Sequence, residues 1–295
     1  MLFLILAHVG DETAIQVYAM LRARYGEEQV KLVSSEELVF APYWMHLLED
    51  MQVITDIHLS NGVLLNSLDI GVVFNRLHEM TMLHFSTEVD RDYATREMTA
   101  LCLSWLASLP CPVVNRPTPT GLGAQTRSHA EWLFLAGKAG FSVQGYHSTT
   151  DPRWCREKTY VPYRWQLFSK DNPRVAFEKV SAQSVSRLPT LYLEPLSECW
   201  QSILVAGDYA VGNLAEQYSA QAIYLASLSG CDLLEITFAS VAVEEGGQTA
   251  HENWKVFGVS SFPYVKSAES ISAIVQLLET KREEYHLDSV ARLRS

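Results

Sequence analysis

The sequence predicts an α/β protein, with an open parallel sheet in its first half and an antiparallel sheet in its second half. The first observation is a strand–helix–strand start, in which apolar Leu2–Ala7 precedes a helical pattern over Thr13–Arg24 and a short strand over Val30–Val33. A helix that links two buried strands is the connection that parallel strands need. The second observation is a pair of strands, Leu233–Ala242 and Trp254–Ser260, which are close enough in sequence to pair antiparallel.

Turn signals and hydrophobic periodicity predict the other elements of the first half. Ser60-Asn61-Gly62 predicts a hairpin, because Asn-Gly strongly favours a tight turn between strands. Pro110 ends a long amphipathic helix, since proline cannot continue one. The predicted elements are two short strands within Ile54–Leu65, a strand over Ile70–Phe74, a helix over Thr87–Leu109, a strand over Val113–Val114, a helix over Gln125–Ala139 and a strand over Phe141–Tyr146.

A change in composition at Asp151 predicts a boundary between two domains, residues 1–150 and 151–295. Residues 151–190 mix Trp, Tyr, Lys and Pro with little periodicity, and we expect a short, irregular subdomain there. Regular patterns then return. The predicted elements are strands over Leu191–Leu193, Ile203–Ala206 and Tyr209–Val211, a helix over Leu214–Leu228, the two antiparallel strands named above and a closing helix over Ser270–Tyr285.

Composition and charge exclude several classes of partner. The 295 residues carry a formal net charge of −11, whereas nucleic-acid binding depends on clustered lysine and arginine. No segment approaches the roughly 20 apolar residues that span a bilayer, and Leu2–Ala7 lacks the basic flank of a signal peptide. The five cysteines include no Cys-x-x-Cys pair, which is typical of reduced thiols. We therefore expect a cytoplasmic protein with no nucleic-acid or membrane partner.

Two Asn-Arg pairs, Asn75-Arg76 and Asn115-Arg116, follow predicted strands of the first sheet. The carboxyl ends of strands form the edge at which open α/β sheets bind ligands. Arginine there could hold a carboxylate or an acidic peptide side chain through two hydrogen bonds. The alternative is that each arginine pairs with a nearby acid of the chain, such as Glu97. We predict that these four residues bind a partner.

Two stretches near the C-terminus, Gly230–Ala239 and Trp254–Pro263, resemble the nucleotide-binding strands of the ATP-grasp ligases. The resemblance implies an acidic metal ligand on the first strand and a Glu-x-Asn pair on the second. Thr237, Gly258 and Ser260 stand at those positions. Magnesium prefers anionic oxygen ligands, so the resemblance implies a lost metal site. Glu235 is not expected to replace the missing acid, because we place it on the other side of its strand.

The first half resembles the pre-ATP-grasp domain of the peptide-acting branch, which includes the microviridin-type macrocycle ligases. The resemblance rests on Val73–Arg76, the long helix after it, Val113–Pro117 and Ser128-His129, which replaces the Asn-Lys of the family. It implies a lid in which a lysine clamps the nucleotide and glycines cover the phosphates. Lys158, Lys170 and Lys179 are the lysines available, and no glycine occurs between Tyr146 and Ala206. The resemblance thus implies a truncated ATP-grasp-like domain with a shortened lid.

The segment His8-Val9-Gly10-Asp11-Glu12 resembles the first motif of zinc-dependent deacetylases. His8 and Asp11 have the spacing of two zinc ligands of that family. Gly10 stands where its general base would be, and no later His-rich segment matches. The alternative is that Asp11 caps the following helix, and we prefer it.

Three functions remain as hypotheses. The first is a pseudoenzyme: an ATP-grasp-like scaffold that binds a peptide or a partner protein. An active ATP-grasp ligase is one candidate partner, and no cofactor is expected. The second is an active ATP-dependent carboxylate–amine ligase whose ATP and magnesium are held by acids not recognised in the sequence. The third is a zinc deacetylase that uses His8 and Asp11. A homodimer is possible in each case.

Overall fold

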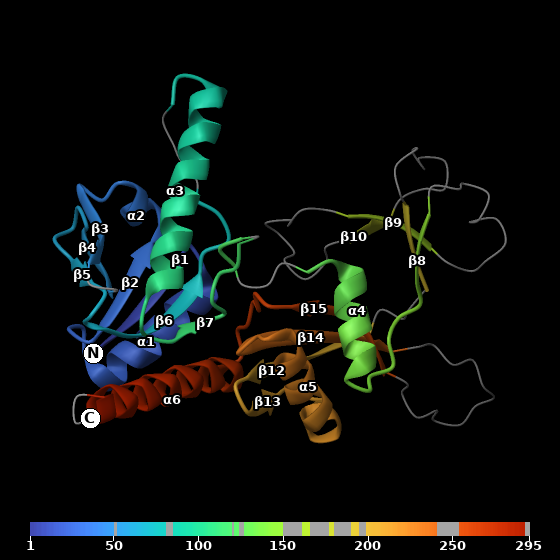
Figure 1. The fold of residues 1–295 in the computed structure, drawn as a ribbon. Helices are drawn as coiled ribbons and strands as arrows, with labels where there is room; N and C mark the ends of the chain where they lie inside the picture. Colours follow the sequence, from blue (N-terminus) through green and yellow to red (C-terminus); the bar gives the residue numbers. More distant parts are fainter. Residues whose placement is uncertain are drawn as a thin grey trace, which may run out of the picture.

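The computed structural model describes residues 1–49, 52–80, 85–119, 121–123, 127–149, 161–165, 177–179, 190–194, 199–240 and 254–292. The described strands form four sheets, one parallel and three antiparallel. Figure 1 shows the parallel sheet beside the N-terminus, with the long helix α6 running from it to the largest antiparallel sheet. The mixed α/β class predicted from the sequence is confirmed. No described helix is both long enough and apolar enough to cross a membrane.

The parallel sheet has the order β2-β1-β6-β7 and is buried on both faces. Phe3 and Ile5 pack on one face with helices α1 and α6, whereas Leu4 and Leu6 pack on the other with α2 and α3. A sheet covered on both sides explains the continuous apolar run of its first strand. The elements are β1 (Leu2–Ala7), α1 (Glu12–Tyr25), β2 (Val30–Ser34), α2 (Ser35–Val39), β6 (Ile70–Arg76), α3 (Glu88–Ser108), β7 (Val113–Val114) and α6 (Ala268–Arg292).

A three-stranded antiparallel sheet, β3-β4-β5, is inserted between β2 and β6. Its strands are β3 (Tyr43–Glu49), β4 (Gln52–His58) and β5 (Leu64–Asn66). The hairpin around Asn61-Gly62 is confirmed, because β4 and β5 pair antiparallel across it. The sequence analysis missed α2 and β3. Trp44 of β3 packs edge-on against Trp105 of α3, at 5.5 Å between ring centroids, so this sheet is fixed by a long-range contact.

Helix α3 begins after Thr87, whose hydroxyl accepts a hydrogen bond from the amide of Asp90. The second half of the helix is packed, with Cys102, Trp105 and Leu106 buried. Its first half is different, because Glu88–Tyr93 is exposed throughout. Figure 1 shows this half extending beyond the ends of the parallel strands.

The largest antiparallel sheet has the order β13-β12-β14-β15. Helices α4 and α5 cover one face, where Leu225 packs with Ile236. Helix α6 covers part of the other face, where Leu204 and Leu233 join the core beneath the parallel sheet. The two halves of the chain therefore share a core. The elements are α4 (His129–Lys138), β12 (Trp200–Ala206), β13 (Tyr209–Val211), α5 (Ala215–Ser229), β14 (Leu233–Ser240) and β15 (Trp254–Ser260).

The remaining sheet has the order β10-β9-β11-β8 and is antiparallel. Its strands are β8 (Tyr146–Thr149), β9 (Val161–Trp165), β10 (Phe177–Lys179) and β11 (Thr190–Leu193). Most of the predicted short lid, residues 151–190, lies outside the described residues, as do Lys158 and Lys170. The domain boundary at residue 150 stays a prediction.

Two predicted boundaries were wrong. The strand predicted over Phe141–Tyr146 begins at Tyr146, and Val143 contributes only an isolated bridge to Val256. The helix predicted from residue 125 begins at His129, because Ser128 and Glu131 form a reciprocal capping box that fixes its first turn. The capping box thus sets the start of the helix about four residues later than the sequence analysis placed it.

Candidate functional site

The candidate site lies where the carboxyl ends of β6 and β7 meet β14 and the loop after β15. Its central residue is Arg76, at the end of β6, with 2% of its surface exposed. Arg76 Nε donates a hydrogen bond to Asp11 Oδ2 at 2.6 Å, and its Nη1 donates to the carbonyl of Pro263 at 2.8 Å. The guanidinium also lies 4.2 Å from the ring centroid of Phe262. A buried cation therefore lies in contact with a half-buried anion and a half-buried ring.

Asp11 has a second role, at the start of α1. Its Oδ1 accepts a hydrogen bond from the amide of Ala14 at 3.0 Å, which is the helix cap that the sequence suggested. Its Oδ2 pairs with Arg76. Both oxygens are thus used, which favours the capping interpretation over a zinc ligand. The acid beside Arg76 is Asp11, on the neighbouring loop, and not Glu97.

The two asparagines tie segments of the chain together. Asn115 has a positive φ of 54°, a conformation that asparagine tolerates better than most residues. Its side chain donates to the carbonyl of Leu233 at 2.9 Å and accepts from the amide of Leu233 at 3.0 Å, so it joins β7 to β14. Asn75 donates to the carbonyl of Leu122 at 2.7 Å. Both asparagines are buried.

Arg116 lies apart from this cluster. Its guanidinium donates to the carbonyls of Ala107 at 3.0 Å and Cys111 at 2.9 Å, at the end of α3 and in the following loop. A cation there satisfies carbonyls that the helix leaves open and complements the helix dipole. The structure therefore brings Asn75, Arg76 and Asn115 to the junction and gives each an internal partner. Partner binding by these residues and by Arg116 stays a prediction.

The sequence analysis placed Glu235 on the wrong side of its strand relative to Thr237. Side chains two residues apart on a strand point to the same face, so Glu235 and Thr237 share one face of β14. The carboxylate is buried, with 5% of the residue exposed. Its charge acts on Arg76: burial lowers the pKa of that guanidinium, while the carboxylates of Asp11 and Glu235 oppose the shift. The strand period alone could have identified this residue.

The three residues that the sequence resemblance assigns to the metal positions, Thr237, Gly258 and Ser260, lie on β14 and β15. Thr237 is paired with Gly258, and Glu235 is paired with Ser260. The hydroxyl of Ser260 accepts a hydrogen bond from the amide of Phe262 at 3.0 Å. Glu235 is the one acidic residue of β14 and β15, and its charge opposes the lowering of the Arg76 pKa. These residues do not fit magnesium, which prefers several anionic oxygens in octahedral geometry.

No group of three or more metal-ligating side chains occurs among the residues that the structure describes. His8 Nδ1 lies 3.1 Å from the hydroxyl of Ser35, and His8 Nε2 accepts a hydrogen bond from the amide of His78 at 3.4 Å. The centroids of the two imidazole rings lie 4.1 Å apart, and burial lowers the pKa of both histidines. The zinc hypothesis therefore gains no third ligand from this part of the chain, and the absence of a cofactor stays a prediction.

Solved structures of known proteins share this fold, although comparisons of the sequence find no match. No family model matches the sequence, and no curated protein matches it. The fold is similar to that of macrocyclase MdnB from Microcystis aeruginosa MRC, with a TM-score of 0.74, 13% sequence identity, and coverage of 94% of this chain and 98% of that one. Macrocyclase MdnC from the same organism, bound to precursor peptide MdnA, gives 0.71 at 13% identity, covering 95% and 100%.

A third structure adds a nucleotide-bound relative. The RiPP-associated ATP-grasp ligase of Chryseobacterium gregarium, in complex with ADP and a leader and core peptide, gives a TM-score of 0.70 at 13% identity. The match covers 95% of this chain and 97% of that one. Similarity over nearly the whole of both chains shows a shared arrangement of elements. The chain therefore has the fold of the ATP-grasp ligases, in the form seen in these three structures.

Proposed function

We propose that the chain is a peptide-binding pseudoenzyme, with the ATP-grasp fold but without ATP-grasp catalysis. One feature of the chain carries the proposal: by the sequence resemblance, Thr237, Gly258 and Ser260 stand at the metal positions of the ATP-grasp ligases, and Glu235, the one acidic residue of β14 and β15, acts on Arg76 through its charge. Phosphoryl transfer depends on cations that neutralise the terminal phosphates. Without a magnesium site, formation of an acyl phosphate should be very slow.

The structurally similar proteins support a peptide as the partner. MdnC was solved with its precursor peptide, and the C. gregarium ligase with a leader and core peptide. A chain that keeps this fold and loses the metal could present a peptide to another enzyme, and an active ATP-grasp ligase is a candidate for that enzyme. We further propose a cytoplasmic location, because the buried Cys102, Cys111 and Cys231 are free thiols.

An active ligase is the second candidate, and Glu235 favours it. This carboxylate lies on the face that carries Thr237, opposite Ser260 on β15. If it turned from Arg76 toward a bound nucleotide, it would give magnesium one anionic ligand. One carboxylate is fewer than the site of the family supplies, so the pseudoenzyme remains the preferred function.

Nucleotide binding separates the two candidates. The experiment is a thermal-shift and calorimetric titration of the whole chain with ATP, with magnesium or with EDTA. A ligand at a hundred times its Kd stabilises a fold by about 2.7 kcal/mol, which such a titration detects. The pseudoenzyme should show no magnesium-dependent shift. The ligase should show one that Glu235→Gln removes, and that result would overturn the proposal.

Peptide binding needs its own test. Selection of displayed random 15-residue peptides against the immobilised chain should yield related sequences that bind the free chain in solution. Boiled protein on the same support is the control for adhesion to exposed apolar groups. If no selected peptide binds the native chain more tightly than its scrambled version, the peptide-binding part of the proposal fails.

A further inference from the structure

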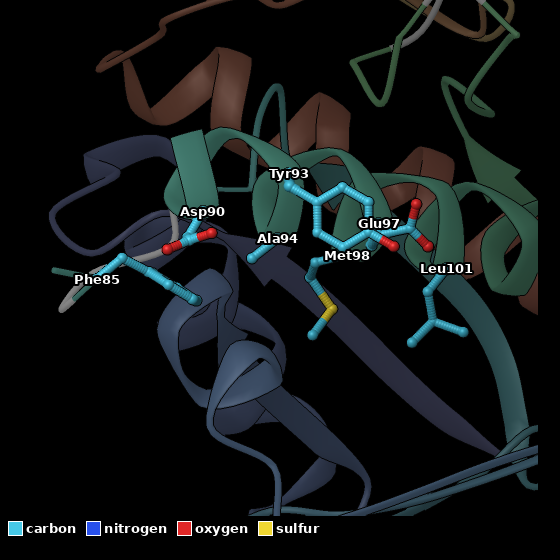
Figure 2. A pocket seen from close by; sticks show the side chains of 7 residues that line it. All are labelled: Phe85, Asp90, Tyr93, Ala94, Glu97, Met98 and Leu101. Carbon is cyan, nitrogen blue, oxygen red and sulfur yellow. The ribbon is translucent and has the colours of Figure 1, made fainter. Parts of the chain in front are cut away.

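A shallow groove runs along α3, beginning at its exposed N-terminal half. Its volume is about 770 Å³, and it is lined by Phe85, Asp90, Tyr93, Ala94, Glu97, Met98 and Leu101. Figure 2 shows these side chains on one side of the helix, with Phe85 beyond its N-terminal end. Positions 90, 93, 94, 97, 98 and 101 follow the spacing at which one helix packs against another.

The groove combines apolar contact area with negative charge. Tyr93 on the helix is 65% exposed, and Phe85, which precedes the helix, is 41% exposed, so two large aromatic rings face solvent here. Asp90 and Glu97 lie two turns apart on the same face. Asp90 accepts a hydrogen bond from the hydroxyl of Thr87, and neither carboxylate forms an ion pair with a cation among the described residues. The face is therefore suited to a partner that is both apolar and basic.

A second copy of the chain is a poor occupant. A twofold contact places the same face against itself, so Asp90 and Glu97 would approach carboxylates and apolar groups of the other copy. Buried carboxylates without a cation are costly. The arginine of the first turn, Arg91, already pairs with Glu88 at 3.3 Å. The net charge of −11 also repels an identical chain and attracts a basic one.

We propose that this groove docks a basic amphipathic helix from a peptide partner. Asp90 and Glu97 are seven residues apart, which is about 10 Å along a helix axis. A partner helix that lies along α3 would therefore carry two lysines or arginines seven residues apart. Large aliphatic side chains between them would pack on Tyr93 and Met98. This inference rests on the proposed peptide-binding function and identifies the surface and the chemistry of the peptide.

The test uses two fluorescein-labelled 15-residue amphipathic helical peptides. Both have leucines at helix-packing positions; one has lysines seven residues apart, and the other has glutamates in their place. Binding to the whole chain is followed by fluorescence polarisation. The lysine peptide should bind at least about tenfold more tightly, and the Asp90→Lys/Glu97→Lys chain should reverse the preference. Salt should weaken both effects, since exposed charges are screened.

Glu88→Lys/Asp92→Lys is the matched control, because it makes the same charge change on the opposite face of the same exposed turns. This variant should keep the preference for the lysine peptide within about threefold. Circular dichroism checks that both variants keep their helix content. Equal binding of the two peptides by the native chain, or an equal effect of the two double substitutions, would overturn the proposal.

Two further outcomes distinguish this inference from the proposed function. If light scattering shows a dimer that Asp90→Lys/Glu97→Lys dissociates, the groove belongs to a second copy and the inference is wrong. If selected peptides bind but do not respond to that substitution, peptides bind elsewhere, and the inference fails while the proposed function stands. A magnesium-dependent shift with ATP would instead overturn the pseudoenzyme and leave the groove result unaffected.

Discussion

Replacing Arg76 by methionine should strongly destabilise the fold. Methionine keeps much of the side-chain volume and removes the charge. Asp11, whose side chain is 9% exposed, would remain as a buried carboxylate without its cation. Breaking a buried pair in this way costs about 3–5 kcal/mol, and the loss of the hydrogen bond to the Pro263 carbonyl adds about 1–3 kcal/mol. Relaxation around Asp11 offsets part of this, so we expect a total on the order of 4 kcal/mol.

The assay is urea unfolding, followed by tryptophan fluorescence and by circular dichroism. Two probes are needed because a chain of this size can unfold in more than one step. Asp11→Asn keeps a helix cap of similar strength and removes the negative charge. The double variant removes both charges, so its cost should be well below the sum of the two single costs. Arg22→Met is the control, since the Arg22–Glu27 pair is exposed and should contribute under about 1 kcal/mol.

Two results would refute this reasoning. A cost below about 1 kcal/mol for Arg76→Met would mean that the pair behaves like an exposed one. Strictly additive costs in the double variant would mean that Arg76 and Asp11 do not interact. Either result would mean that the charge of Arg76 does not organise the candidate site. The assignment of Glu235 to that site would then fail as well, because it depends on the effect of Glu235 on Arg76.

The remaining predictions concern protonation, thiol reactivity and backbone conformation. Burial lowers the pKa of His129 from 6.5 to about 4, so the unfolded chain binds the extra proton and stability should fall by on the order of 3 kcal/mol between pH 6.5 and 4; urea unfolding should show less of this loss in His129→Gln. Exposed Cys199 should react with iodoacetamide long before buried Cys102, whose pKa is raised to about 12, as peptide mapping would show. Gly212→Ala should cost about 1–3 kcal/mol in thermal unfolding, because its φ is 131° and a Cβ would lie 2.3 Å from a backbone oxygen; Gly258→Ala, which meets open space, should cost little, and equal effects would contradict the geometry.

Local sequence patterns predicted most elements of the fold. The apolar run Leu2–Ala7, the Asn61-Gly62 turn and the long helix closed by Pro110 each carry their signal within a few residues, and the structure has each of them. Strand β3 was missed because its residues Tyr43–Glu49 show no clean alternation. Its place depends on the contact between Trp44 and Trp105, which are far apart in sequence. Patterns within a short window cannot report such a contact.

Sequence alone also determined which side chains stand where the resemblance expects metal ligands, because Thr237, Gly258 and Ser260 are read directly from it. Only the tertiary structure decided how the charges are arranged. Asp11 is 65 residues from Arg76 along the chain, and Glu235 lies on another sheet, yet both carboxylates act on one guanidinium. The partner of a buried charge depends on where strand ends converge in space. The packing of the whole core sets where the strand ends converge, and no single segment of the sequence contains that information.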